Sequence, residues 1–168
     1  TKYNQYLSYL GKIGTKALFS SKDYELYESI RALSIIKEMP NVDKEDLAKA
    51  EALVLYNQQN LGTPSEMALL SRLQWWSVEY GLIGDINHPK IYGAGLLSSI
   101  GESASCMQPE VKKIKYTIDA LQVGYDITKE QPQLFVTPTF QNLIDVLTQF
   151  ESTMAFRVGG LESILKAI

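Results

Sequence analysis

The chain has 168 residues, of which 45% are hydrophobic and 21% are charged, and these values are ordinary for a single globular domain. The net charge of −3 comes without a basic stripe, which argues against nucleic acid and anionic membranes as partners. No apolar run approaches the roughly 20 residues that are needed to span a bilayer. The single cysteine, Cys106, excludes an intrachain disulfide and favours a reducing, cytoplasmic compartment.

Helical periodicity dominates the first half of the chain. The spacing of apolar residues predicts one helix over residues 3–14 and a second over residues 24–36, which stops near Pro40. Residues 43–60 are rich in strong helix formers and begin with acidic residues, which predicts a third helix that ends before Gly62. The tyrosines of these segments recur at helical spacing, and we expect them in the core.

A fourth helix has the clearest start signal. Thr63 can cap it, Pro64 suits its first position, and Glu66 completes a capping box. The helix is expected to continue through Glu79 and to stop at Gly81.

The second half is more irregular. Residues 90–95 predict a short extended segment with a glycine-flanked turn, residues 96–106 a short helix, and residues 133–136 a strand. A last helix opens at Thr137-Pro138 and has one apolar face, made by Phe140, Leu143, Ile144, Leu147 and Phe150. Residues 161–168 also have a helix-like apolar pattern. The expected fold class is mainly α with a few short β-strands.

Glu79 is the first candidate for chemistry. On a helix, Trp75 and Trp76 lie one turn before it, and two aliphatic residues would follow one turn after it. A carboxylate buried in such a place without a partner is costly. Two interpretations stay open: Glu79 reaches water or Arg72 at the flank of the apolar face, or a metal or another strong cation lies opposite it.

Other residue patterns carry weaker signals. The only histidine, His88, lies in a turn-prone loop and is interpreted as a solvated surface residue, whereas Cys106 is interpreted as a small buried hydrophobe. With one histidine and one cysteine, the chain cannot build the usual zinc site. The glycine-serine segment 92–99 can bring backbone close to a small ligand, but a tight turn that enters a helix explains it better.

Two blocks resemble the pterin-dependent aromatic amino acid hydroxylases, the phenylalanine hydroxylase group in particular. They are residues 75–82 (WWSVEYGL) and 91–102 (IYGAGLLSSIGE), in the order of that family and close to its spacing. Segments 7–17, 125–136 and 140–150 give further support. The resemblance implies the C-terminal portion of a single hydroxylase catalytic domain, truncated at its N-terminal side.

The resemblance is weakest at residues 41–60, which are interpreted as an inserted helix, and after Arg157. In the family, two histidines and one glutamate hold a ferrous ion, and the resemblance assigns the glutamate to Glu79. The two histidines belong to an HxxxxH motif expected upstream of Thr1. The chain alone is therefore expected to bind neither iron nor tetrahydropterin and to be inactive.

The resemblance also assigns further roles. The residues that it places at the substrate site are Trp75, Gly95, Ser98, Ser99 and Tyr125. Glu102 matches a position that anchors the site from behind. Gln74 departs from the animal enzymes, which have a tyrosine beside the iron at this position.

The implied function is that of an iron(II)- and tetrahydropterin-dependent monooxygenase, which hydroxylates a small aromatic amino acid, with phenylalanine as the leading candidate. The alternative is a non-catalytic helical regulatory or interaction domain derived from the same fold, which Gln74 and the absent histidines favour. Removal of the upstream half would uncover apolar surface, so self-association of the chain is also expected.

Overall fold

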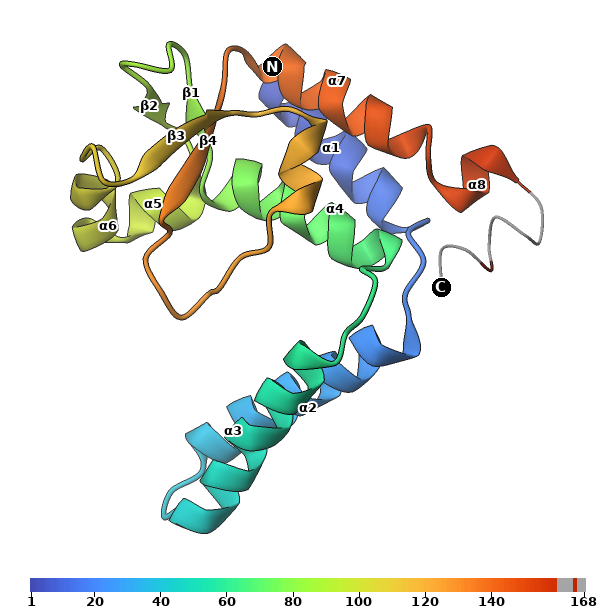
Figure 1. The fold of residues 1–168 in the computed structure, drawn as a ribbon, viewed down its shortest axis with the longest axis vertical. Helices are drawn as coiled ribbons and strands as arrows, with labels where there is room; N and C mark the ends of the chain where they lie inside the picture. The colour runs from blue at the N-terminus through green and yellow to red at the C-terminus, as the bar shows by residue number, and fades with distance from the viewer. Residues whose placement is uncertain (160–164, 166–168) are drawn as a thin grey trace.

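The computed structural model describes residues 1–159 and residue 165, and in this part of the chain helices pack against a small sheet that lies at one side of the molecule (Figure 1). The helices are α1 (Lys2–Gly14), α2 (Ser21–Glu38), α3 (Lys44–Gln59), α4 (Glu66–Gln74), the π-helix η1 (Trp75–Glu79), α5 (Ala94–Ser98), α6 (Ile100–Ser105), the 3-10 helix η2 (Ile118–Gln122), α7 (Phe140–Glu151) and α8 (Ala155–Val158). The strands are β1 (Leu82–Ile83), β2 (Lys90–Ile91), β3 (Lys112–Lys115) and β4 (Gln133–Thr137). The expected fold class, mainly α with a few short strands, is confirmed.

Helices α2 and α3 form a hairpin that extends away from the rest of the molecule (Figure 1). A capping box starts α2, because the Ser20 hydroxyl accepts from the Asp23 amide (3.1 Å) and the Asp23 carboxylate accepts from the Ser20 amide (2.9 Å). Asn41 has a φ of +67°, a conformation that asparagine tolerates, and it turns the chain between the helices. Asp43 then caps α3 by accepting from the Glu45 amide (3.0 Å).

The start of α4 differs from the sequence prediction. Ser65, and not Thr63, is the N-cap, since its hydroxyl accepts from the backbone amide of Ala68 (3.1 Å). Ser65 stands three residues before that amide, which is the spacing that a capping side chain needs. Pro64 consequently precedes the cap and is not the first helical residue.

Glu66 also has a different role from the predicted one. It makes no capping box; its Oε1 accepts from the backbone amide of Leu18 (3.2 Å) and its Oε2 from that of Ala155 (2.8 Å). The Met67 amide donates to the Leu18 carbonyl (3.1 Å). This buried carboxylate therefore joins the base of the α2–α3 hairpin to the start of α8.

The helix that was predicted to include Glu79 ends where expected, but its last part is not an α-helix. After Gln74 the α-helix becomes the π-helix η1, in which the Tyr80 amide donates to the Trp75 carbonyl five residues back (2.9 Å). The hydroxyl of Ser77, in the middle of η1, donates to the Leu73 carbonyl (2.6 Å). Periodicity alone does not reveal such a change of register.

The sheet has the strand order β2-β1-β4-β3, and only the β1–β2 pair is antiparallel. The sequence prediction found β2 and β4 but missed the other two strands. Strand β1 has only two residues, and β3 is a largely exposed Lys-Lys-Ile-Lys segment without an apolar face. Residues 94–106, predicted as a turn and one helix, form two short helices that meet at Ser99, the N-cap of α6.

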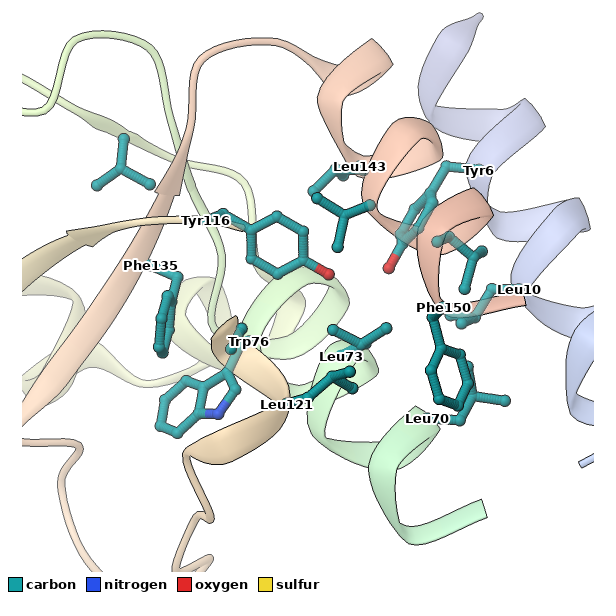
Figure 2. Close-up of a cluster of buried hydrophobic side chains, with 14 of the residues drawn as sticks. Tyr6, Leu10, Leu70, Leu73, Trp76, Tyr116, Leu121, Phe135, Leu143 and Phe150 are labelled. Atoms are coloured by element: carbon teal, nitrogen blue, oxygen red, sulfur yellow. The ribbon is translucent and has the colours of Figure 1, made fainter. Parts of the chain in front are cut away.

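The core lies where α1, α4 and α7 pack together beside β4 (Figure 2). Its largest fully buried side chains come from each of these elements and from η1, and they include Tyr6, Leu73, Trp76, Leu134, Leu147 and Phe150. The residues of the apolar face predicted for the last helix lie in this core or pack against it. Cys106 is buried, as expected.

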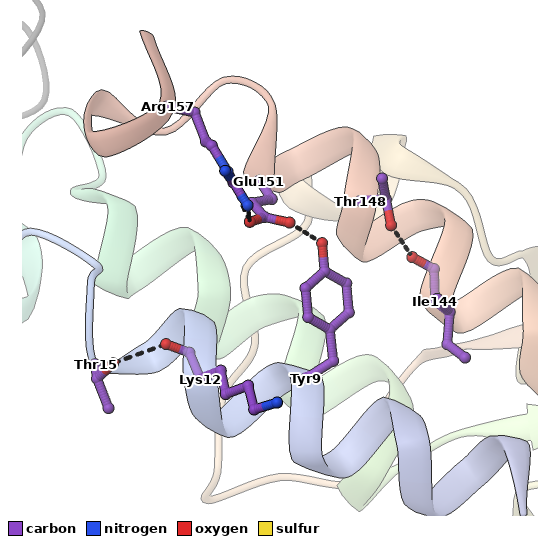
Figure 3. Close-up of polar contacts among 7 residues, drawn as sticks. All are labelled: Tyr9, Lys12, Thr15, Ile144, Thr148, Glu151 and Arg157. Carbon is purple, nitrogen blue, oxygen red and sulfur yellow. Dashed lines mark hydrogen bonds and ion pairs between the residues drawn. The ribbon is translucent and has the colours of Figure 1, made fainter. Parts of the chain in front are cut away.

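Polar contacts join the C-terminal end of α7 to α1 (Figure 3). The Tyr9 hydroxyl donates to the Glu151 carboxylate, which also accepts from Arg157 Nε (2.9 Å). The hydrogen bond from Tyr9, followed by that from Arg157, lowers the pKa of Glu151.

The apolar pattern predicted for residues 161–168 lies, apart from residue 165, outside the described residues. No helix in the described part of the chain has the length and apolar character that crossing a membrane requires.

Candidate functional site

Glu79 lies at the end of η1, where the start of α5 packs closely against it. A Cβ added at Gly95 would lie 2.9 Å from the Tyr80 ring and 3.3 Å from Oε2 of Glu79. A Cβ at Gly93 would lie 2.5 Å from the Glu79 carbonyl oxygen. Only glycine lets the two segments approach this closely, so the YGAG part of the sequence brings its backbone against the Glu79 carboxylate.

Trp75 lies between two tyrosine rings. The Tyr80 ring stacks on it at a centroid distance of 4.4 Å and an angle of 26°, and the Tyr125 ring at 4.5 Å and 9°. The indole Nε1 is buried and has no hydrogen-bond partner among the described residues. The chain's own aromatic side chains thus cover both faces of Trp75.

Two hydrogen bonds hold the segment that leads to Tyr125. The Trp76 indole donates to the Val123 carbonyl (2.8 Å), and the Arg72 guanidinium donates to the Leu121 carbonyl (2.7 Å). Arg72 is therefore directed toward η2. Within the described part of the chain, the Glu79 side chain has no hydrogen bond or ion pair, although it is half-buried.

A second carboxylate, Glu102, lies behind the site. It is buried, lies close to the Gln131 backbone, and has one oxygen without a partner among the described residues. Burial raises the pKa of Glu102, against the opposite effect of the nearby Gln131 backbone. Burial, followed by the nearby carboxylates of Glu102 and Glu79, raises the pKa of the Tyr80 hydroxyl. The sequence analysis gave Tyr80 no role, although this residue follows Glu79 directly in the motif.

The two serines of the predicted site differ in their surroundings. Ser98 is exposed, and its hydroxyl donates to the Gly95 carbonyl (3.0 Å). Ser99 caps α6, where its hydroxyl accepts from the Glu102 amide (3.3 Å). Close contacts thus join Glu79, Gly95, Tyr80, Trp75 and Tyr125 in one cluster, whereas Ser98 and Ser99 lie at the following turn.

The described residues bring together no group of three His, Cys, Asp or Glu side chains that could hold a metal ion. His88 is exposed in its loop, as the sequence predicted. Gln74 is also exposed and lines a shallow hollow between α1 and α4, together with Val78. Among the predicted ligands, the chain itself therefore provides one carboxylate, Glu79.

Comparison with known proteins gives one family match. The model of the family described as "Biopterin-dependent aromatic amino acid hydroxylase" matches residues 43–159, well over half of the chain. The phenylalanine-4-hydroxylase of Dictyostelium discoideum is 36% identical over 86 residues, which are 51% of this chain and 20% of that protein. The phenylalanine-4-hydroxylase of Vibrio cholerae is 38% identical over 84 residues, 48% of this chain and 29% of that protein. The matched part spans only a fifth to a third of the length of such relatives.

Solved structures with similarity to the chain include phenylalanine hydroxylase from Legionella pneumophila. It is 34% identical, with 67% of this chain and 51% of that chain covered, at a TM-score of 0.47. The iron- and phenylalanine-bound phenylalanine hydroxylase from Chromobacterium violaceum is 28% identical, with 65% and 44% covered, at a TM-score of 0.46.

Proposed function

The chain belongs to the biopterin-dependent aromatic amino acid hydroxylase family, and on this basis we propose that it is part of an enzyme that hydroxylates an aromatic amino acid, with phenylalanine as the first candidate. Its relatives named phenylalanine-4-hydroxylase support this substrate. The proposal includes that residues 1–168 are the C-terminal portion of the catalytic domain and that residues 41–60 are an insertion in it. A cytoplasmic location is proposed on the single cysteine alone.

Glu79 is proposed as one ligand of a ferrous ion. A carboxylate oxygen is a suitable donor for iron, and the half-buried Glu79 carboxylate has no competing partner among the described residues. The donor set is incomplete within these residues, so the other ligands must come from elsewhere in the complete protein. Bound iron and tetrahydropterin would supply the activation of oxygen; this chain would contribute the carboxylate and the walls around it.

The proposed substrate site includes Trp75, Gly95 and Tyr125, with Ser98 and Ser99 at the next turn. The stacked rings of Trp75 and Tyr125 offer an apolar wall that excludes water and suits an aromatic side chain. Because Tyr80 and Tyr125 cover both faces of Trp75, a substrate ring can reach Trp75 at its edge, or face-on after Tyr125 has moved. Glu102 is proposed to support the cluster from behind, where it is buried close to the Gln131 backbone.

The observation that carries the proposal is the contact of Glu79 with the glycine turn at Gly95, inside the segment that the family model matches. The test compares the complete protein with its Glu79→Ala variant in Fe(II) binding and in tetrahydropterin-dependent hydroxylation of phenylalanine, tyrosine and tryptophan. We expect Glu79→Ala to lower iron affinity by about a hundredfold and to abolish turnover. The exposed Glu110 provides a matched control, since Glu110→Ala should change neither.

A non-catalytic interaction domain remains the second candidate, because the α2–α3 hairpin exposes large apolar side chains such as Tyr27 and Tyr56. These side chains also support the proposed self-association of the chain. Folded, iron-loaded protein that hydroxylates none of the three amino acids would favour this second candidate. Unchanged iron binding in Glu79→Ala would remove Glu79 from the ligand set.

A further inference from the structure

The core beneath η1 contains a hydrogen-bonded pair of hydroxyls from distant parts of the chain. Tyr6 of α1 and Ser77 of η1 are both 0% exposed, and their oxygens lie 2.7 Å apart. The single hydroxyl hydrogen of Ser77 is directed to the Leu73 carbonyl (2.6 Å), so Tyr6 is the donor to Ser77. In Figure 2 the Tyr6 hydroxyl points from α1 into the core, toward the hydroxyl of Tyr116.

The hydrogen bond between Tyr6 and Ser77 adds little to the stability of the core. Phenylalanine at position 6 and alanine at position 77 would keep nearly the same shape and would remove two buried hydroxyls. A buried hydrogen bond instead favours one arrangement of the segments that it joins over others of similar energy. The pair therefore fixes where α1 and η1 lie relative to each other.

The segment that it fixes is the one that bears Glu79. Ser77 is the middle residue of η1, two residues before Glu79, and its carbonyl also accepts from the Gly81 amide (3.0 Å). A π-helical turn is rare and holds one residue more than an α-helical turn, so the two registers compete. A slip by one residue would rotate a following side chain by about 100°, since a turn holds 3.6 residues.

We propose that the hydrogen bond from Tyr6 to Ser77 holds η1 in its π-helical register and thereby directs the Glu79 carboxylate toward the metal. Tyr6 and Ser77 are positioning residues, because they would act through Glu79 and neither is proposed as a ligand. The inference rests on the proposed function, in which Glu79 is a ligand of iron.

The test uses the complete protein and measures Fe(II) affinity, together with the absorption spectrum of the Co(II)-substituted site. Tyr6→Phe and Ser77→Ala should each weaken Fe(II) binding by about tenfold and shift the Co(II) spectrum. Ser77→Thr keeps the hydroxyl and should bind iron as the unaltered protein does. Because the two residues act through one bond, the double variant should be little worse than either single variant.

A matched control separates positioning from stability. Val146 is buried in α7 and has no polar side-chain atom that could hold η1, so Val146→Ala should lower thermal stability but leave iron affinity and the Co(II) spectrum unchanged. In the enzyme assay, Tyr6→Phe should lower kcat and leave the KM for the amino acid unchanged.

The outcomes are distinguishable from those of the Glu79 test. If Glu79→Ala loses iron while Tyr6→Phe and Ser77→Ala keep the affinity and spectrum of the unaltered protein, the positioning role is wrong and the proposed function stands. If Glu79→Ala itself keeps iron, the proposed function fails, and this inference fails with it. Should Tyr6→Phe not fold, Ser77→Ala against Ser77→Thr tests the same bond.

Discussion

The body of the molecule, formed by α1, the sheet and the helices from α4 onward, differs from the α2–α3 hairpin in how it is stabilised. In the body, Leu73, Trp76 and Leu147 are all 0% exposed. In the hairpin, Ser29 is the one buried residue, and the large apolar side chains that remain exposed are Tyr24, Tyr27, Ile30, Ile35, Met39, Leu53, Leu55 and Tyr56. Two helices that pack only on each other bury the side chains along their line of contact, the seam. In the body, side chains are enclosed by several helices and strands.

This difference shows that a helical apolar pattern does not by itself locate a core. The hairpin helices are longer than those of the body and have similar N-caps, yet hydrophobic burial stabilises only the body strongly. The hairpin depends instead on its caps, on its seam and on the contacts at its base. The proposed site lies entirely in the body, where rigid packing can hold Glu79 and Trp75 in place.

The largest expected effect comes from truncating one leucine in each region. Leu73→Ala should lower the free energy of unfolding by about 2–5 kcal/mol, because it leaves a cavity in a fully buried place. Leu53→Ala in the hairpin, where the side chain is 51% exposed, should cost less than about 1 kcal/mol. Urea denaturation followed by circular dichroism measures both. Equal costs would mean that the exposed face of the hairpin is covered in the complete protein.

A smaller effect is expected at the junction of the two regions. Glu66→Gln should lower the free energy of unfolding by about 1–3 kcal/mol, because one carboxylate oxygen that accepts from a backbone amide becomes an amide nitrogen. Hydrogen exchange should accelerate at the amides of Leu18 and Ala155. The exposed Glu25 of the hairpin provides the control, since Glu25→Gln should change neither quantity by much. Unchanged exchange at both amides would contradict the anchoring role of Glu66.

Much of the fold could be predicted from the sequence, because apolar periodicity marks the helix at residues 3–14 and a run of strong helix formers marks the helix at residues 43–60. The helices at residues 3–14 and 43–60 were found with nearly correct ends, as was the strand at 133–136. The cap of α4 was misassigned because Thr63 and Ser65 are both capping residues, and only the Ala68 contact decides between them. The tyrosines at positions 24 and 27 were expected in a core, but periodicity cannot say which apolar faces meet a partner.

The candidate site was less accessible to sequence reasoning. The motif around Glu79 indicates the candidate ligand, and the glycines at 93 and 95 indicate close backbone approach. However, the stacking of Tyr125 on Trp75 joins residues 50 positions apart through a segment without periodic structure. The hydrogen bond between Tyr6 and Ser77 likewise joins residues 71 positions apart, and neither residue type predicts it. The roles of these site residues stay predictions until the variants are measured.

The smallest expected effect concerns the surface of the hairpin. Lys37 of α2 and Glu51 of α3 form an ion pair across the hairpin at 3.3 Å, with side chains 54% and 52% exposed. Because water and salt screen such a pair, a double-mutant cycle with Lys37→Gln and Glu51→Gln should give a coupling of about 0.2–1 kcal/mol, which weakens in high salt. The pair Glu45–Lys49 within α3 (2.7 Å) should give a similar value and serves as the reference for a fully solvated surface.

The two coupling energies together show whether the hairpin surface is exposed to water, independently of the leucine variants. A coupling at Lys37–Glu51 that clearly exceeds the reference and resists salt would indicate that this surface is shielded from water in the complete protein. The hairpin would then resemble the body, with its burial supplied by a partner surface. Equal, salt-sensitive couplings would instead support a hairpin that stands in solvent and is stabilised by its caps, its seam and the anchor at Glu66.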